Sequence, residues 1–395
     1  MNRAQPIVVV APYSPIGSGD IPALGAAKKI ASVVAALSAL GREVILVNSA
    51  HNAEKRANLK IEKSEIRPGL QVRTITLPTS ASRPFGKAWN LLFARSLARE
   101  VIREIAGDGI SLLWIYNGYA FESRFALEVM GKTGCPLVVE MEDMPFARKR
   151  PAKLKPMLDH HYLHCALPEA SLVTCVNELI PQALGVPSKK IFLLPGLIEN
   201  TLLDAAAANT PFTGSGCTAG YFGNLSEEKG AHLILQLLQS PPAGWRFVVT
   251  GSGPLEEKFA EAAAKYPALL KFLPNATDNT VVAGMLECDT IINPHRPIEG
   301  MGNGVFPFKV IEGLASGRVV ISTPVPACGL RLDDAVLFFQ HSVTALCEAL
   351  EAAPSFYVAH AGNIQALANE VRAKYSELAL TNEIRRRFFP VGMRA

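Results

Sequence analysis

The chain alternates short apolar runs with longer helical stretches, and it does so in two successive series. The first series has its apolar runs at 7–11, 44–47, 112–116, 137–140 and 172–176. The second series has them at 218–222, 246–250, 270–273, 290–293 and 319–323. Buried strands that alternate with helices form parallel sheets covered by helices on both faces. We therefore predict an α/β protein with two tandem Rossmann-like domains.

The length and composition agree with two folded domains. The chain has 395 residues, of which 49% are hydrophobic and 19% charged, so it exceeds the usual size of a single core. A stretch without clear periodicity, rich in Ala, Pro, Gly and Thr, runs from about 194 to 216. We predict an N-terminal domain at 1–195, a C-terminal domain at 196–375, and a helical segment at 376–395 that packs back on the N-terminal domain.

The net charge of +4 is too small to indicate a nucleic-acid-binding protein. The seven cysteines form no CxxC pair, as is typical of free thiols in a reducing compartment. No apolar run reaches the length of a membrane span, and the first residues lead directly into a predicted strand. We therefore expect a cytoplasmic protein that does not bind nucleic acid.

Two basic segments leave a second location open. The run 148–155 holds five Lys or Arg residues, and the apolar stretch 83–106 is punctuated by Lys87, Arg95, Arg99 and Arg103. Such segments dock on anionic membrane surfaces, which would place the protein on the inner face of the cell membrane. The alternative is an ordinary core helix with solvated arginines.

The segment 306–323 carries the most specific chemical signal. Pro307 suits the first turn of a helix, Gly317 suits its left-handed end, and a short buried strand follows. Lys309 and Glu312 are three residues apart and share one face near the helix N-terminus. There a lysine can meet a diphosphate, while a carboxylate can accept hydrogen bonds from ribose hydroxyls. Alone, the pair also fits a surface ion pair.

Three loops follow strands of the second series, where open α/β sheets bind ligands. The loop 220–230 contains Gly223 and Lys229, the turn 250–254 reads Thr-Gly-Ser-Gly-Pro, and the loop 293–304 contains His295 and several glycines. Glycines allow close approach of the backbone to a phosphate, and the lysine supplies a cation.

In this order and spacing, the loops and the Pro-x-Lys-x-x-Glu helix resemble the nucleotide-sugar half of retaining GT-B glycosyltransferases of the family-4 type. The resemblance implies a GT-B fold with a cleft between the domains and a nucleotide-diphosphate sugar as donor. It also implies transfer with retention to a glycan, lipid-linked or small-molecule acceptor, in cell-surface polysaccharide or glycoconjugate synthesis. Neither a cofactor nor a divalent metal is required.

The resemblance also implies roles for individual residues. It implies that Lys229 and Lys309 both contact the donor diphosphate and that Glu312 binds the ribose. Both lysines would then stabilise the leaving diphosphate in the transition state. The remaining predicted donor-binding residues are Gly17, Gly223, Asn224, Gly251, Ser252, Gly253, His295 and Asn303. Two positions depart from the family pattern, since Asn224 replaces a common arginine and Gly304 replaces a common glutamate.

Acceptor-side candidates follow strands of the first series. Glu142 and Asp143 are predicted catalytic residues that orient an acceptor hydroxyl or face the donor sugar, and Glu140 shares their segment. The alternative is an internal ion-pair set with Arg148–Arg150. Asn117 stands where family members often place a catalytic histidine, although an Asn-Gly turn explains it equally well.

Two further interpretations remain open for the whole chain. A GT-B-shaped epimerase would act on the nucleotide sugar without an acceptor, and a non-catalytic partner protein would only bind it. His160 and His164 lie one helical turn apart, but no distant third ligand is indicated, so no metal site is predicted.

Overall fold

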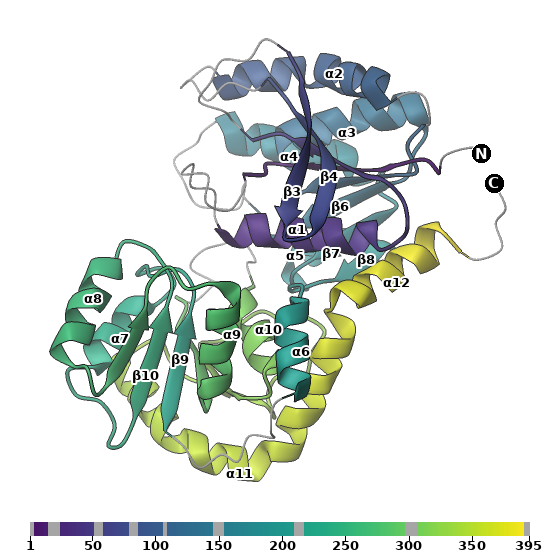
Figure 1. Ribbon diagram of the computed structural model, residues 1–395. Coiled ribbons are helices and arrows are strands. Elements are labelled where there is room, and N and C mark those ends of the chain that lie inside the picture. The colour runs from purple at the N-terminus through teal and green to yellow at the C-terminus, as the bar shows by residue number, and fades with distance from the viewer. Residues whose placement is uncertain are drawn as a thin grey trace. The chain divides into compact units, whose positions relative to one another are not determined.

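The computed structural model describes residues 4–14, 24–50, 58–78, 86–105, 109–144, 154–208, 217–296 and 306–390. The chain divides into two compact units, which are described in turn (Figure 1). Unit 1 comprises Met1–Leu197 together with Glu377–Ala395, and unit 2 comprises Ile198–Ser376.

Unit 1 is built on one eight-stranded sheet with the strand order β3-β4-β2-β1-β5-β6-β7-β8. The strands are β1 (Ile7–Ala11), β2 (Val44–Asn48), β3 (Lys60–Arg67), β4 (Leu70–Thr76), β5 (Leu112–Tyr116), β6 (Leu137–Met141), β7 (Leu172–Cys175) and β8 (Ile191–Leu193). The helices are α1 (Leu24–Ser38), α2 (Gly86–Ile105), α3 (Ala120–Thr133), α4 (Leu154–Ala166), α5 (Leu179–Ala183) and α12 (Glu377–Phe388). Only β3 and β4 pair antiparallel, so the sheet is otherwise parallel.

The centre of this sheet is its most buried part. All residues of β1 and β5 are buried, as expected for strands covered on both faces. From β1 the chain adds strands toward β3, and from β5 it adds them toward β8. The direction of strand addition therefore reverses between β1 and β5. Open α/β sheets form their ligand crevice at the carboxyl edge beside such a reversal.

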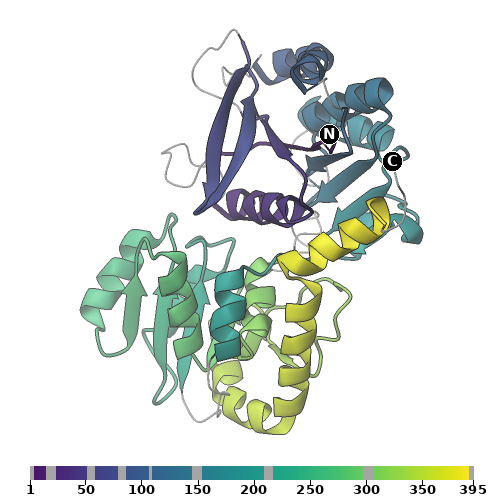
Figure 2. The same cartoon turned by 45° about the vertical axis from the view of Figure 1, so that its right-hand side comes forward.

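The last helix of the chain belongs to unit 1. The α12 helix packs against α1, and the Thr381 hydroxyl donates to the Ala36 carbonyl at 2.7 Å (Figure 2). Arg67 on β3 makes a two-pronged ion pair with Glu377, at 2.5 and 2.8 Å. The end of the chain is thus attached to the unit that contains its beginning.

Unit 2 is built on a fully parallel six-stranded sheet with the order β11-β10-β9-β12-β13-β14. Its strands are β9 (Thr218–Phe222), β10 (Arg246–Thr250), β11 (Leu270–Leu273), β12 (Thr290–Asn293), β13 (Val319–Ser322) and β14 (Val336–Phe338). Its helices are α6 (Asn200–Ala208), α7 (Ala231–Leu237), α8 (Glu256–Lys265), α9 (Asp278–Glu287), α10 (Phe308–Ala315) and α11 (Val343–Lys374). The direction of strand addition reverses between β9 and β12.

The predicted fold class is confirmed: each predicted strand forms, with ends that agree within one residue. The sequence reading missed β3, β4, β8 and β14. The β3 strand is largely exposed and polar, while β8 and β14 have only three residues each, so none of these three shows a long apolar run. At the end of the chain, α11 (Val343–Lys374) and α12 (Glu377–Phe388) are separate helices. Among the described residues, no helix is both long and apolar enough to cross a membrane.

Candidate functional site

Three loops meet at the carboxyl edge of unit 2, beside the reversal between β9 and β12. The backbone N–H of Gly223 donates to Thr250 O at 3.0 Å, and Leu225 N–H donates to Ser252 O at 2.9 Å. A Cβ on Gly251 would lie 1.8 Å from Gly223 O, and one on Gly230 would lie 1.7 Å from Pro294 O. Both glycines also have positive φ angles, of 145° and 76°. Only glycine therefore permits the loops to pack this closely.

Lys229 and His295 are in direct contact in this loop cluster. Lys229 Nζ lies 3.0 Å from His295 Nε2, and His295 Nδ1 lies 2.7 Å from the Arg296 carbonyl oxygen. A carbonyl can only accept, so we assign the imidazole proton to Nδ1, which leaves Nε2 to accept from the Lys229 ammonium. Burial, with the adjacent Lys229 charge, lowers the pKa of His295 to about 4. His295 is therefore neutral near pH 7.

Lys309 adds a second amine to the same region. It lies on α10 and is buried, and among the described residues its Nζ has no hydrogen-bond partner. The Nζ lies 3.9 Å from the centre of the Tyr221 ring, and a Cβ on Gly223 would lie 3.6 Å from it. Burial, followed by the charge of Lys229, lowers the pKa of Lys309 to about 7, while Glu312 acts in the opposite direction. A buried amine of this kind favours an anionic ligand.

The structure brings most predicted donor-site residues to this one edge. Gly223 and Asn224 follow β9, and Gly251, Ser252 and Gly253 follow β10. Lys229 lies before α7, His295 follows β12, and Lys309 and Glu312 share α10. The side chains of Asn224 and Ser252 are exposed, whereas Glu312 is half-buried. The predicted residues Gly17 and Asn303 lie outside the described residues.

Tyr221 was missed by the sequence reading. It is a fully buried residue of β9, its ring faces Lys309, and its hydroxyl donates to Asn224 O at 2.6 Å. In the sequence it is one aromatic residue in an apolar strand, so no pattern distinguishes it from a core residue.

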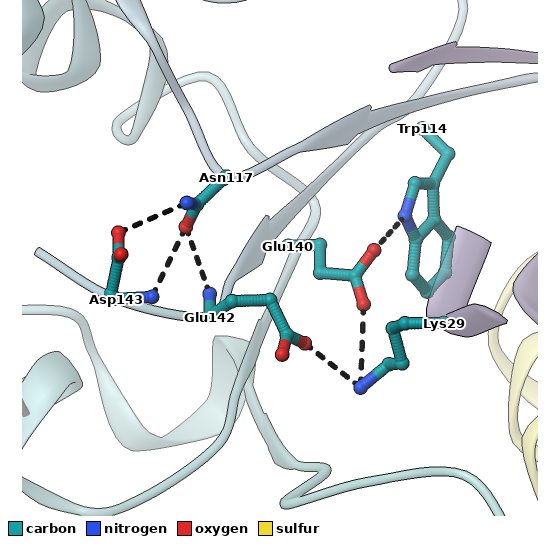
Figure 3. A network of polar contacts seen from close by, with 6 residues as sticks. All are labelled: Lys29, Trp114, Asn117, Glu140, Glu142 and Asp143. Carbon is teal, nitrogen blue, oxygen red and sulfur yellow. Dashed lines mark hydrogen bonds and ion pairs between the residues drawn. The ribbon is translucent and has the colours of Figure 1, made fainter. Parts of the chain in front are cut away.

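A second polar cluster lies in unit 1, at the carboxyl ends of its central strands (Figure 3). Lys29 Nζ on α1 lies 2.8 Å from Glu142 Oε1 and 3.5 Å from Glu140 Oε1. Trp114 Nε1 donates to Glu140 Oε2 at 2.8 Å. Burial raises the pKa of Glu140 to about 7 even though the Lys29 charge lowers it. Burial alone would lower the pKa of Lys29, but Glu142 and Glu140 together raise it.

Asn117 positions the backbone of the same cluster. Its side-chain oxygen accepts from the N–H groups of Glu142 and Asp143, at 2.9 and 3.1 Å, and its amide donates to Asp143 Oδ1 at 3.0 Å. Its φ of 60° shows that it is also the turn residue that the sequence suggested. Lys29 was not predicted, and the Arg148–Arg150 partners of the alternative reading lie outside the described residues.

No group of three potential metal ligands occurs among the described His, Cys, Asp and Glu side chains. The rings of His160 and His164, both exposed on α4, are tilted by 33° to each other with their centres 4.0 Å apart.

The loop cluster lies within a segment that matches a known family. Residues 216–354 match the family of glycosyl transferases group 1. This segment contains the loop cluster and all of the sheet of unit 2. A search among curated proteins gave no match.

Solved structures match nearly the whole chain. Sucrose-phosphate synthase from Thermosynechococcus elongatus is 16% identical with a TM-score of 0.67, over 97% of this chain and 98% of that one. Anabaena Alr3699/HepE, solved in complex with UDP, is 13% identical with a TM-score of 0.64, over 96% and 98%. The trehalose-6-phosphate synthase of Burkholderia multivorans is 12% identical with a TM-score of 0.66, over 98% of each chain. The chain therefore has the GT-B fold of two-domain glycosyltransferases.

Proposed function

We propose that the protein is a retaining glycosyltransferase that moves a sugar from a nucleotide-diphosphate donor to a glycan, lipid-linked or small-molecule acceptor. The observation that carries this proposal is the grouping of Lys229, His295 and Lys309 at the topological reversal of unit 2. Glu312 lies one helical turn from Lys309 and offers a carboxylate for ribose hydroxyls. The match of residues 216–354 to glycosyl transferases group 1 supports the same function.

The grouping suits the chemistry of sugar transfer. Cleavage of a sugar–phosphate bond leaves negative charge on the diphosphate while positive charge develops on the sugar. Two lysine amines can donate hydrogen bonds to that diphosphate in a largely buried site. The neutral His295 imidazole holds one of them, because its Nε2 accepts from Lys229. In the retaining route, the leaving phosphate accepts the proton of the acceptor hydroxyl on the same face. The lysines then stabilise the charge that the leaving group retains, without a metal ion.

Unit 1 supplies the candidates for the acceptor side. Asn117 binds the backbone N–H groups of Glu142 and Asp143 and donates to the Asp143 carboxylate, and Lys29 pairs with the Glu142 carboxylate. Carboxylates held in this way can orient an acceptor hydroxyl. We propose Glu142 and Asp143 for this role, with synthesis of cell-surface polysaccharide or glycoconjugate as the setting.

Incubation of the purified protein with a panel of nucleotide sugars and a membrane extract tests the proposed function. We expect release of the nucleoside diphosphate together with incorporation of labelled sugar, and an anomeric linkage that matches the donor by NMR. An isomerised donor without incorporation would identify an epimerase. Binding without turnover would identify a non-catalytic partner. Either outcome would overturn the proposal.

We also propose peripheral contact with an anionic membrane through the segments 83–106 and 148–155. Both described parts of these segments expose apolar side chains beside cations. On α2, Leu92 is 62% exposed and is followed by Arg95 and Arg99. On α4, Leu154 is 65% exposed beside Lys155, and Met157, which lies just beyond the second segment, is 67% exposed. Apolar side chains and cations together bind anionic lipid surfaces.

Flotation with lipid vesicles tests the membrane contact. We expect the protein to bind vesicles that contain an anionic phospholipid, and to bind neutral vesicles much more weakly. The double variant Leu92→Ser/Met157→Ser should lose most of the binding, whereas Leu378→Ser, an exposed leucine on α12, should not. Equal binding of all three proteins would contradict the contact.

A further inference from the structure

The buried amine of Lys309 lies over the ring of Tyr221, a residue that is itself fully buried. Among the described residues Lys309 Nζ has no hydrogen-bond partner, and it lies 3.9 Å from the centre of the Tyr221 ring. The negative face of an aromatic ring attracts a cation, and the attraction is strongest where water is excluded. Tyr221 is fully buried and Lys309 nearly so. The ring therefore favours both the charged state and the position of this amine.

The same tyrosine also holds the neighbouring loop. Its hydroxyl donates to Asn224 O at 2.6 Å, in the segment whose Gly223 and Leu225 N–H groups bond to the loop after β10. The ring and the hydroxyl act on different parts of the site: the ring acts on an amine of α10, and the hydroxyl acts on the backbone after β9. Tyr221 thus links the loop after β9 to α10.

We propose that Tyr221 is a positioning residue of the donor diphosphate site, with its ring holding the Lys309 ammonium and its hydroxyl holding the Asn224 carbonyl. The inference rests on the proposed function, because it assigns the site a diphosphate. It makes two separable statements. The effect of the ring depends on Lys309, whereas the effect of the hydroxyl is independent of Lys309.

The groups that surround Lys309 all influence the pH at which its amine titrates. The Tyr221 ring faces Lys309 from β9. The charge of Lys229, in the loop before α7, lowers the pKa of Lys309, and Glu312 on α10 raises it. The charge of Lys309 in turn lowers the pKa of His295, at the end of β12. Both variants, Tyr221→Leu and Tyr221→Phe, leave these other groups in place. Only the leucine variant removes the aromatic face.

The first test needs no ligand. The titration midpoint of Lys309 is followed through the NMR signals of isotope-labelled lysine side chains, with the Lys309 signal assigned by its absence in Lys309→Met. We expect Tyr221→Leu to move this midpoint to lower pH and Tyr221→Phe to leave it in place. An unchanged midpoint in Tyr221→Leu, or an equal change in both variants, would show that the ring does not hold the ammonium.

The second test is a double-mutant cycle measured by calorimetry with UDP, ADP and GDP as probes. Tyr221→Leu should weaken binding of the tightest probe on the order of tenfold, and it should have little further effect in the Lys309→Met background. Tyr221→Phe should weaken binding a few-fold, by the same factor in both backgrounds. A purely structural role would give equal losses for Tyr221→Leu in both backgrounds and would overturn the proposal.

The two tests separate this inference from the proposed function. If the probes bind but the cycle is additive, Tyr221 alone is wrongly assigned. If none of the three diphosphates binds the unaltered protein, the proposed donor site is wrong, and the positioning role falls with it even where the titration shows the ring–ammonium contact.

Discussion

Replacement of Lys229 or Lys309 by methionine is expected to lower kcat/KM for the nucleotide sugar about 10²- to 10³-fold. Each lysine offers a positive hydrogen-bond donor that becomes most valuable when charge develops on the leaving diphosphate. Lys258→Met is the matched control, because Lys258 is an exposed lysine of unit 2 on α8. Steady-state kinetics of labelled-sugar transfer measure the effect, and full activity in either variant would contradict the donor-site assignment.

Donor binding should also depend on pH through Lys309, whose pKa of about 7 is low for a lysine because of its burial and the nearby Lys229 charge. Below pH 7 the amine already carries the charge that a diphosphate requires. Above pH 7 it must first take up a proton, so affinity should fall by up to about tenfold per pH unit. Lys309→Met should lack this decrease. The unaltered protein and Lys309→Met are measured with the same ligand. Any change in the protonation of the ligand therefore affects both affinities equally and does not contribute to the difference between them.

The stability of the unliganded protein should change in the opposite direction. Lys309 binds its proton less tightly in the folded state than in the unfolded state, so its contribution to stability rises as pH increases from about 7 toward the ordinary lysine value of 10.5. Replacement by methionine removes a buried charge and should stabilise unit 2 by about 1–3 kcal/mol at pH 7. Chemical denaturation measures this change. A variant that is more stable but inactive cannot have lost activity through misfolding.

Replacement of Lys29 by methionine should destabilise unit 1 by about 3–5 kcal/mol at pH 8, because it leaves the buried Glu140 carboxylate without its cation. The remaining Trp114 hydrogen bond cannot neutralise the charge. Lys63→Met, at an exposed position of β3, is the control and should change stability little. Adding Glu140→Gln to Lys29→Met should recover much of the loss, since the introduced amide oxygen can still accept from the indole N–H.

The pH dependence of this loss follows from Glu140. Burial raises its pKa from the ordinary 4.5 to about 7, so the folded state holds the proton more tightly and stability falls as pH rises across this interval. Without Lys29 the pKa of Glu140 should rise further, which extends the decrease above pH 7. The deficit of Lys29→Met should therefore be small near pH 5 and largest above pH 7. A deficit independent of pH, measured by urea denaturation, would show that lost packing rather than the carboxylate charge is responsible.

Strands and helices could be predicted from the sequence wherever one property, such as a continuous apolar run or a residue that ends a helix, determines the structure of a segment. The central strands of both sheets could be predicted because buried strands need continuous apolar runs. The α10 helix could be predicted because Pro307 and Gly317 mark its two ends, and Gly317 does take a left-handed φ of 73°. The polar β3 strand was not predicted, because it lies at the edge of the sheet and is largely exposed. Exposed strands do not need an apolar pattern.

The sequence by itself determined the fold class and the glycine-rich loops that follow the strands of unit 2, because local periodicity and turn chemistry are written in consecutive residues. Only the tertiary structure decided which groups meet. Tyr221 lies under Lys309, and Lys229 lies against His295. Lys29 pairs with Glu140 although 111 positions (140 − 29) separate the two residues in the sequence. These contacts depend on where parallel strands end beside one another, and burial then sets the charge of each group. No local pattern contains that information.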